Sequence, residues 1–159
     1  MALRDEDTRW LGRCVELARR ALDEGDEPFG SVLVSAYGRL LFEDRNHVAG
    51  GDTTAQPELA IAHWSLANLT PVQRAAATVY TSGEHCPMCA AAHAWVGLGR
   101  IVFAVSGAQL AQWLIEWQAP LPPVAPLPVT AVGPHLVADG PAPRYRDEMM
   151  DLYAAKFRP

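Results

Sequence analysis

Residues 80–89 read Tyr-Thr-Ser-Gly-Glu-His-Cys-Pro-Met-Cys, and this stretch decides how the chain is organised. It contains two cysteines three positions apart, and Pro87 between them favours the first position of a helix. Cys86 and Cys89 are therefore expected in the first turn of that helix or just before it. Free amide donors and the helix dipole favour a thiolate there. Two such thiols make half of a zinc site.

A second segment, Gln56-Pro57-Glu58, repeats this geometry thirty residues earlier. Pro57 again suits the first helical position, so Gln56 precedes a helix and Glu58 falls in its first turn. Two helices that begin near one point would assemble a site from both segments. Hydrolytic deamination needs an activated water and a carboxylate that acts first as base and then as acid. The pairing of thiols with Glu58 points to that chemistry.

The two segments together resemble the zinc-dependent cytidine deaminase superfamily, whose signature is H-x-E followed by P-C-x-x-C. The phrase Thr81-Ser82-x-Glu84 before the cysteines makes the chain most similar to guanine deaminase-like enzymes that act on free nucleobases or triazines. The sequence departs from the family pattern twice. Gln56 stands in place of the histidine ligand, and His85 replaces the proline before the first cysteine.

The resemblance implies a role for each residue that matches the family pattern. Glu58 is expected to be the catalytic proton shuttle. Zinc is the expected cofactor, bound by Cys86, Cys89 and Gln56. The expected substrate contacts are Asn46, Phe29, Pro57, Ser82 and Glu84. Asn46 aligns with the asparagine that reads the base in the family, but an asparagine at this position is also suited to capping a loop.

Three outcomes are open for Gln56, because an amide oxygen is a weak, neutral and hard donor compared with imidazole. Gln56 coordinates zinc poorly, another histidine supplies the nitrogen, or the metal is lost together with the activity. His93 is the best substitute, because it lies four residues after Cys89 on the same helical face. The other histidines considered are His47, near by loop proximity, His85, expected to point away, and His63, two turns along its helix. We expect Gln56 to take the third position.

Composition limits the function further. The chain has 159 residues, half of them hydrophobic, which is enough for one substantial core and predicts a single domain over residues 1–159. A net charge of −5 disfavours nucleic acid as a partner. The charged amino terminus and the lack of a long apolar run predict a cytoplasmic protein without membrane association. Three cysteines, an odd number, argue against a disulfide framework, and Cys14 is expected in the core.

Strand and helix patterns alternate along the chain, which predicts parallel crossovers and a sheet covered on both faces. Eight prolines between Pro120 and Pro143 make residues 119–143 a Pro-rich segment, with Val129–Val132 as a candidate last strand. The resemblance implies an α/β fold, a three-layer α/β/α cytidine deaminase-like domain with a central mixed sheet of about five strands. Helices are expected at 8–24, 57–69, 87–98, after Ser106 and at 144–158, and strands at 31–36, 39–43, 77–81 and 101–105.

The function implied by the resemblance is zinc-dependent hydrolytic deamination of a free aminated heterocyclic base, with release of ammonia. The base would be guanine or a modified purine, a cytosine analogue or an amino-triazine. Members of the family are often dimeric, so a homodimer is expected. Two alternatives stay open: a metal-poor relative that serves as a binding or scaffold protein, and a tRNA adenosine deaminase. Trp113, Trp117 and Tyr153 are suited to stacking on a flat ring, or to a core or a subunit interface.

Overall fold

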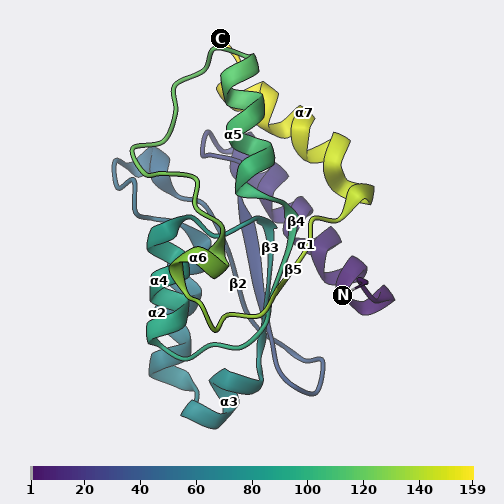
Figure 1. Ribbon diagram of the computed structural model, residues 1–159, viewed down its shortest axis with the longest axis vertical. Coiled ribbons are helices and arrows are strands. Elements are labelled where there is room, and N and C mark those ends of the chain that lie inside the picture. The colour runs from purple at the N-terminus through teal and green to yellow at the C-terminus, as the bar shows by residue number, and fades with distance from the viewer. Residues whose placement is uncertain (1) are drawn as a thin grey trace.

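The computed structural model of the protein describes residues 2–159. Helices and strands alternate along most of the chain (Figure 1). The helices are α1 (Asp5–Asp23), α2 (Pro57–Asn68), α3 (Pro71–Ala76), α4 (Pro87–Trp95), α5 (Gly107–Glu116), α6 (Val129–Val132) and α7 (Arg146–Phe157), with short 3-10 turns η1 (Val48–Gly50) and η2 (Pro143–Tyr145). The strands are β1 (Gly30–Val34), β2 (Leu40–Arg45), β3 (Thr78–Gly83), β4 (Ile101–Val105) and β5 (Ala138–Asp139).

The strands form one mixed sheet in the order β2-β1-β3-β4-β5. Strand β1 pairs antiparallel with both β2 and β3, whereas β3, β4 and β5 run parallel to one another. The strands expected at 31–36 and 39–43 are β1 and β2 and form a hairpin, and α4 belongs to the crossover between β3 and β4. Gly83 at the end of β3 pairs with Val105 at the end of β4. The segments that follow these two strands therefore leave the sheet side by side.

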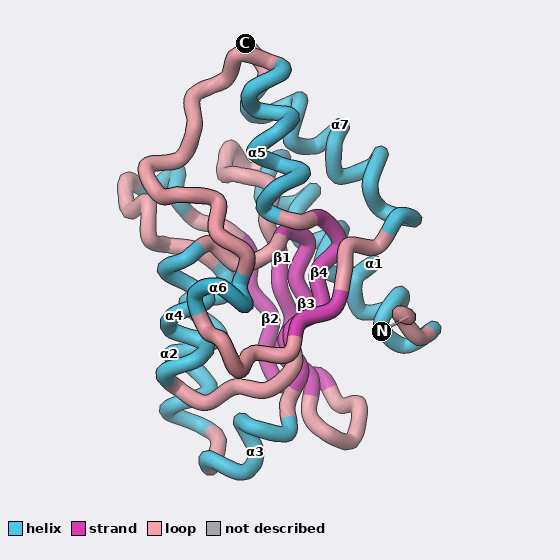
Figure 2. The backbone as a smooth tube through the Cα atoms, in the orientation of Figure 1, coloured by secondary structure: helices cyan, strands magenta, loops and turns pink. Residues whose placement is uncertain are grey.

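Helices cover both faces of the sheet, as Figures 1 and 2 show. Helices α1, α5 and α7 pack on one face around a core that includes Leu11, Trp113 and Met149. Helices α2, α4 and α6 lie on the other face, around residues such as Ile61 and Ala90. Burial of each large apolar side chain contributes about 1.5–3 kcal/mol. The expected three-layer α/β/α fold with a mixed five-stranded sheet is confirmed.

Helix α1 comes very close to the sheet at Gly30, the first residue of β1. A Cβ atom at position 30 would lie 2.4 Å from Leu17 Cβ and 2.5 Å from the Cys14 carbonyl oxygen, so glycine is required there. Cys14 itself is fully buried in the core, as its spacing predicted. This close packing fixes the backbone just after Phe29, one of the predicted substrate contacts.

The prediction of a strand at Val129–Val132 is wrong, because these residues form the single-turn helix α6. A short β-branched run between prolines suits either structure, so its pattern alone does not decide. The amide of Val129 donates to the Glu84 carboxylate at 3.0 Å, and this long-range contact holds the start of the helical turn. The last strand is instead β5, which pairs with β4.

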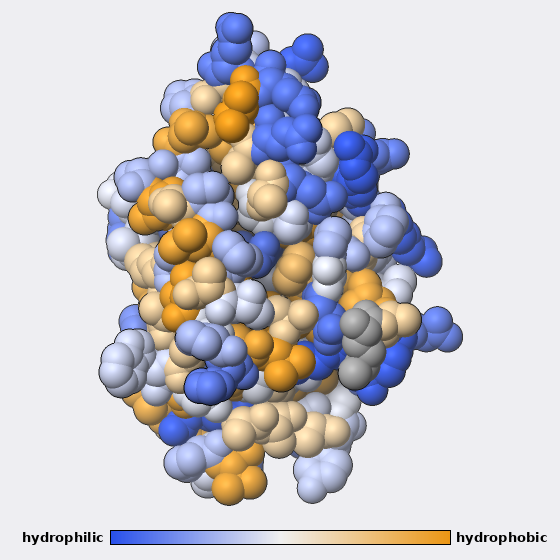
Figure 3. Space-filling model, viewed as in Figure 1, coloured by the Kyte–Doolittle hydropathy of each residue, from blue (hydrophilic) through white to orange (hydrophobic). Residues whose placement is uncertain are grey.

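The Pro-rich segment runs over the surface on the side of α6. Its side chains Leu121, Val124 and Leu127 are exposed, and Figure 3 shows apolar residues gathered on this face. Within residues 2–159, none of the helices combines the length and the apolar character needed to cross a membrane.

Candidate active site

The two cysteines and Gln56 meet at the starts of α4 and α2. Gln56 Oε1 lies 3.2 Å from Cys86 Sγ and 3.3 Å from Cys89 Sγ. Cys86 is the N-cap residue of α4 and Gln56 is the N-cap residue of α2, and a proline follows each of them. The two helix starts therefore converge on one point, and the three predicted metal ligands are neighbours in space.

The side chain of Gln56 is held with its oxygen toward the thiols. Its amide nitrogen donates a hydrogen bond to the Thr53 carbonyl at 3.1 Å. Because the nitrogen is bound on the side of the loop, the carbonyl oxygen is left to face both sulfur atoms. The loop that precedes α2 thus presents the one atom of Gln56 that is able to bind a metal.

The two thiols differ in acidity. A hydrogen bond between them lowers the pKa of Cys86 to about 7. The same hydrogen bond, together with burial, raises the pKa of Cys89. One proton shared between two sulfur atoms accounts for both directions. Cys86 is therefore ready to act as a thiolate near neutral pH, and a bound cation would favour ionisation of both.

Glu58 is a buried carboxylate beside the thiols, with only 6% of its surface exposed. Burial raises the pKa of Glu58, although hydrogen bonds from Thr81 and Ser31 act in the opposite direction. Its negative charge in turn acts to raise the pKa of Cys86 and of Cys89. A buried carboxyl group whose pKa is raised and that is held by hydroxyl groups is suited to proton transfer.

Two hydroxyl groups of the sheet hold Glu58 in place. Thr81 Oγ1 lies 2.7 Å and Ser31 Oγ lies 3.1 Å from Glu58 Oε1. Ser31 and Thr81 face each other across β1 and β3, and their hydroxyl oxygens are 2.8 Å apart. Ser31 was not among the site residues predicted from the sequence. A serine in the otherwise apolar strand Ser-Val-Leu-Val was the signal that could have found it.

Asn46 supports the loop that follows β2. Its Oδ1 accepts hydrogen bonds from the amides of Glu27 and Val48, at 3.2 and 3.0 Å, and the residue is buried. The loop before β1 and the loop after β2 are thereby joined at one side chain. The capping use considered for Asn46 is present, and its expected contact with the base stays a prediction.

The other predicted substrate contacts also have structural partners. Ser82 Oγ accepts a hydrogen bond from the Gly30 amide at 3.0 Å. The Glu84 carboxylate accepts one from Gly107, the first residue of α5, at 2.9 Å, and another from Val129 of α6. Pro57 is buried as the first residue of α2. Contact of these side chains with a substrate stays a prediction.

None of the histidines joins the thiols. His93 Nε2 lies 2.7 Å from the Gly99 carbonyl oxygen, and burial lowers the pKa of His93 to about 4. His85 is buried with its ring edge-on to His93, at 5.2 Å between centroids. His47 pairs with Asp44, and His63 is exposed on α2. Across residues 2–159, no three His, Cys, Asp or Glu side chains are grouped as for a metal ion.

The donors Cys86, Cys89 and Gln56 nevertheless fit a zinc ion. Zinc in a catalytic site takes three protein ligands, at about 2.3 Å for sulfur and about 2.1 Å for oxygen. A tetrahedral arrangement of that size puts sulfur and oxygen about 3.6 Å apart. The distances of 3.2 and 3.3 Å require only a small opening. This donor set differs from a Cys₂His zinc site only in its third ligand, where the Gln56 amide oxygen, a weaker and equally uncharged donor, replaces the histidine nitrogen.

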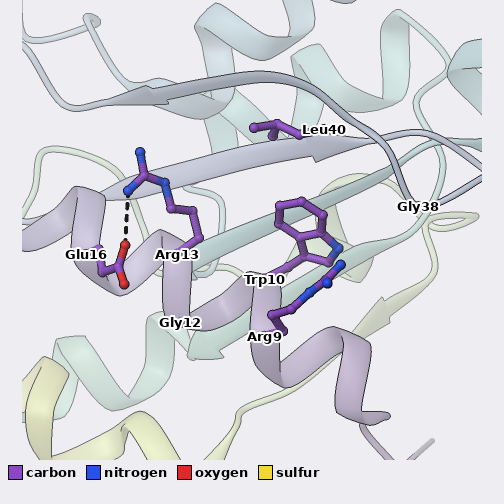
Figure 4. A pocket seen from close by; sticks show the side chains of 7 residues that line it. All are labelled: Arg9, Trp10, Gly12, Arg13, Glu16, Gly38 and Leu40. Carbon is purple, nitrogen blue, oxygen red and sulfur yellow. Dashed lines mark hydrogen bonds and ion pairs between the residues drawn. The ribbon is translucent and has the colours of Figure 1, made fainter.

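The surface also has pockets that are lined by none of the residues of this site. One of about 550 Å³ lies between α1 and the β1–β2 hairpin, lined by Arg9, Trp10, Arg13 and Leu40 among others (Figure 4). Figure 4 shows the ion pair of Arg13 with Glu16 at its rim. It contains neither a thiol nor Glu58, so it has no part in the chemistry considered for the site.

Comparison with known proteins identifies sequence relatives among the deaminases. A family model of the cytidine and deoxycytidylate deaminase zinc-binding region matches residues 4–105. A probable cytosine deaminase of Schizosaccharomyces pombe is 29% identical over 144 residues, which are 84% of this chain and 87% of the relative. The guanine deaminase of Bacillus subtilis is 31% identical over 105 residues, 65% of this chain and 67% of the relative.

A solved structure of the guanine deaminase from Nitrosomonas europaea has a TM-score of 0.70 to this chain at 19% identity. The match covers 98% of this chain and 86% of that one, and at this identity it shows a shared fold. The family model, in contrast, matches well over half of the sequence and includes Gln56, Glu58 and both cysteines. This chain therefore belongs to the family of cytidine and deoxycytidylate deaminases.

Proposed function

We propose that the protein is a zinc-dependent hydrolase that deaminates a free aminated heterocyclic base and releases ammonia. The observation that carries the proposal is the buried carboxylate of Glu58 beside the cluster of Cys86, Cys89 and Gln56 Oε1. Within residues 2–159, no ion pair with Glu58 accounts for the burial of this acid near two thiols. A proton shuttle next to metal ligands explains both its burial and its place.

The reaction replaces the amino group of the base with oxygen from water. Cys86, Cys89 and Gln56 would hold the zinc, which when bound would act as a Lewis acid and lower the pKa of a water molecule to about 7. Glu58 takes a proton from the attacking water and passes it to a ring nitrogen. It then takes the second proton and delivers it to the departing amine, which leaves as ammonia. Thr81 and Ser31 hold the carboxylate in one orientation throughout.

The class of substrate follows from charge and from the relatives. A net charge of −5 provides no general attraction for RNA, whereas a neutral base needs none. The relatives named cytosine deaminase and guanine deaminase act, by their names, on free bases. Guanine or a modified purine, a cytosine analogue and an amino-triazine are the candidates. The homodimer and the cytoplasmic location stay predictions.

Ammonia release from a panel of bases tests this function. The panel contains guanine, cytosine, an amino-triazine and, for the tRNA adenosine deaminase alternative, a tRNA anticodon stem-loop. The purified protein is expected to hold about one zinc per chain and to release ammonia from a free base. Glu58→Gln should lower that rate by at least about 100-fold with zinc content and thermal stability unchanged. Retained turnover in this variant removes Glu58 from the mechanism.

One observation favours a second candidate, a metal-poor relative that binds a ligand without turnover. Gln56 presents an amide oxygen where a zinc site prefers imidazole. Protein that contains no zinc after preparation, and that releases no ammonia when zinc is added, supports this candidate. Protein that gains activity with added zinc supports the enzyme and shows that the metal is held weakly.

A further inference from the structure

The two cysteines at the start of α4 form a dithiol as well as a pair of candidate metal ligands. Both are free thiols, and they are hydrogen-bonded to each other. Both also lie beside one atom, Gln56 Oε1, at 3.2 and 3.3 Å. Cysteines separated by two residues at a helix start are able to form a disulfide. A small approach of the two sulfur atoms, to about 2.05 Å, would complete that bond.

The two thiols differ in their access to solvent. Cys86 is half-buried at the N-cap of α4, whereas Cys89 has no exposed surface. A dissolved oxidant therefore meets Cys86 first, and Cys89 stands behind it to complete the bond. An accessible attacking thiol with a buried resolving thiol is the arrangement of a redox-active Cys-x-x-Cys pair.

Cys14 is the contrasting thiol of the same chain. It is fully buried in the core beneath α1, together with residues such as Leu11 and Val32. The folded chain therefore shields Cys14 from a dissolved oxidant. Its reactivity reports whether the protein is folded during an oxidation experiment.

We propose that Cys86 and Cys89 form a reversible disulfide in the metal-free protein, with a small-molecule disulfide such as oxidised glutathione as the oxidant, and that this disulfide and zinc exclude each other. The pair is thus a site of oxidative modification. It does not depend on which base the protein binds. Oxidation would stop any reaction that needs the metal, so these two residues would make the activity sensitive to the thiol redox state.

The oxidation proceeds by two successive thiol–disulfide exchanges. The Cys86 sulfur attacks one sulfur of oxidised glutathione, and the first glutathione leaves and takes up the proton that Cys86 loses. The Cys89 sulfur then attacks Cys86 Sγ in the mixed disulfide, and the second glutathione leaves with the proton of Cys89. The cysteine pair loses two electrons, and one oxidised glutathione gains them and becomes two reduced molecules.

Zinc binding and oxidation compete because they use the same two sulfur atoms. Zinc takes each cysteine as a thiolate, so the disulfide removes two of the three candidate donors. The third donor, the Gln56 amide oxygen, is weaker than an imidazole nitrogen. At a given concentration of free zinc, a larger fraction of these chains therefore carries the free dithiol than in a protein with a Cys₂His site.

Treatment of the metal-free protein with oxidised glutathione tests the disulfide. Zinc is removed with a chelator under reducing conditions, and the reductant is then removed. After oxidation of the folded protein, the thiols counted in denaturant should fall from three to one, and the remaining thiol should be Cys14. Peptide mapping should place the bond between Cys86 and Cys89, and dithiothreitol should reverse it. Three remaining thiols, or a bond that includes Cys14, overturn the proposal.

Single substitutions test the roles of the two thiols. Cys89→Ser should stop at the mixed disulfide and gain the mass of one glutathione. Cys86→Ser should stay unmodified, because the remaining thiol of the pair is buried. Cys14→Ala is the matched control and should form the disulfide as wild type does. Equal rates of glutathione attachment in Cys86→Ser and Cys89→Ser would contradict the assigned order of attack.

A third measurement tests the competition with zinc. Saturating zinc should slow the oxidation at least about 10-fold, and the oxidised protein should bind zinc at least about 100-fold more weakly in competition with a chelator. At one limiting zinc concentration, the metal should slow the oxidation of Gln56→His more than that of wild type. Gln112→His should respond to zinc as wild type does. An oxidation rate that zinc does not change refutes the mutual exclusion.

The disulfide and the proposed deamination are measured independently. A reversible bond between Cys86 and Cys89 in a protein that releases no ammonia from any base contradicts the proposed function alone. Ammonia release by a protein whose dithiol resists oxidised glutathione after removal of the metal contradicts this inference alone.

Discussion

Thr81 Oγ1 lies 2.7 Å from Glu58 Oε1 and 2.8 Å from the Gly83 carbonyl oxygen. A hydroxyl group has one proton to donate and two lone pairs with which to accept. Thr81 is thus able to donate to the carboxylate, or to accept from the carboxylic acid and donate to Gly83 instead. The strand is thus able to hold the Glu58 side chain in the same place in either of its protonation states.

Thr81→Val is expected to reduce kcat about 10-fold and to change KM little, because the valine keeps the shape of the side chain and loses the hydroxyl. The measurement is steady-state ammonia release. Thr78→Val, at the start of the same strand, is the control and should behave as wild type. Equal kcat values for the Thr81 variant and wild type would show that Ser31 is sufficient to hold Glu58.

Gln56→His is expected to tighten zinc binding by about 10-fold or more, because imidazole is the better donor for this metal. Competition with a chromophoric chelator measures the affinity without reference to activity. Gln112→His, on the exposed side of α5, is the matched control and should leave the affinity unchanged. A histidine at position 56 that fails to tighten zinc would place the third ligand elsewhere.

Asp7→Asn is expected to lower the free energy of unfolding by about 3 kcal/mol at neutral pH. Asp7 is fully buried and accepts hydrogen bonds from Arg100 at 2.8 and 3.1 Å. Burial alone would raise the pKa of Asp7, but the bonds from Arg100, the Arg4 amide and Tyr80 outweigh it and hold the pKa below its usual range.

Because the pKa of Asp7 is lowered in the folded protein, the destabilisation caused by Asp7→Asn depends on pH. A carboxyl group with a lowered pKa in the folded protein stabilises it fully above the unfolded pKa of about 3.9. That contribution is lost as the pH falls from there toward the folded pKa. The difference in urea-unfolding free energy between wild type and Asp7→Asn should therefore be largest at neutral pH and shrink below about pH 4. Asp5→Asn, which is exposed in the same helical turn, should show no such difference.

Gly30→Ala is expected to destabilise the fold by about 1–3 kcal/mol. The added methyl group would press on Leu17 and on the Cys14 carbonyl, and a packed helix and strand have to separate to admit it. Gly50→Ala is the control, since nothing lies within 4 Å of a Cβ atom there. Chemical denaturation measures both. Equal stability of the two variants would contradict the close packing of α1 on β1.

Local sequence patterns were sufficient to predict the parts of the site that begin helices. Proline at the first helical position places Cys86 and Glu58 next to helix starts whatever the rest of the fold does. The resemblance to the deaminase family led to the expectation that the starts of α2 and α4 lie close together in space. Neither source indicated that the Gln56 oxygen would be oriented by Thr53, because that depends on the path of a loop.

Contacts between distant segments explain what the sequence did not predict. Ser31 and Glu58 are brought together by the sheet register, which no local pattern specifies. The helix at Val129–Val132 depends on a carboxylate 45 residues earlier in the chain. Tyr153 was recognised as an aromatic residue suited to stacking or to the core, but its full burial becomes visible only when its neighbours are known.

The Glu84 carboxylate accepts hydrogen bonds from two distant backbone amides, that of Gly107 at one oxygen and that of Val129 at the other. The chain between Gly107 and Val129 therefore leaves the sheet and returns to Glu84, two residues before Cys86. Lengthening or recoding the exposed residues 120–127 would therefore leave both of these contacts in place. An exposed stretch between two fixed backbone contacts is where an inserted loop is best tolerated.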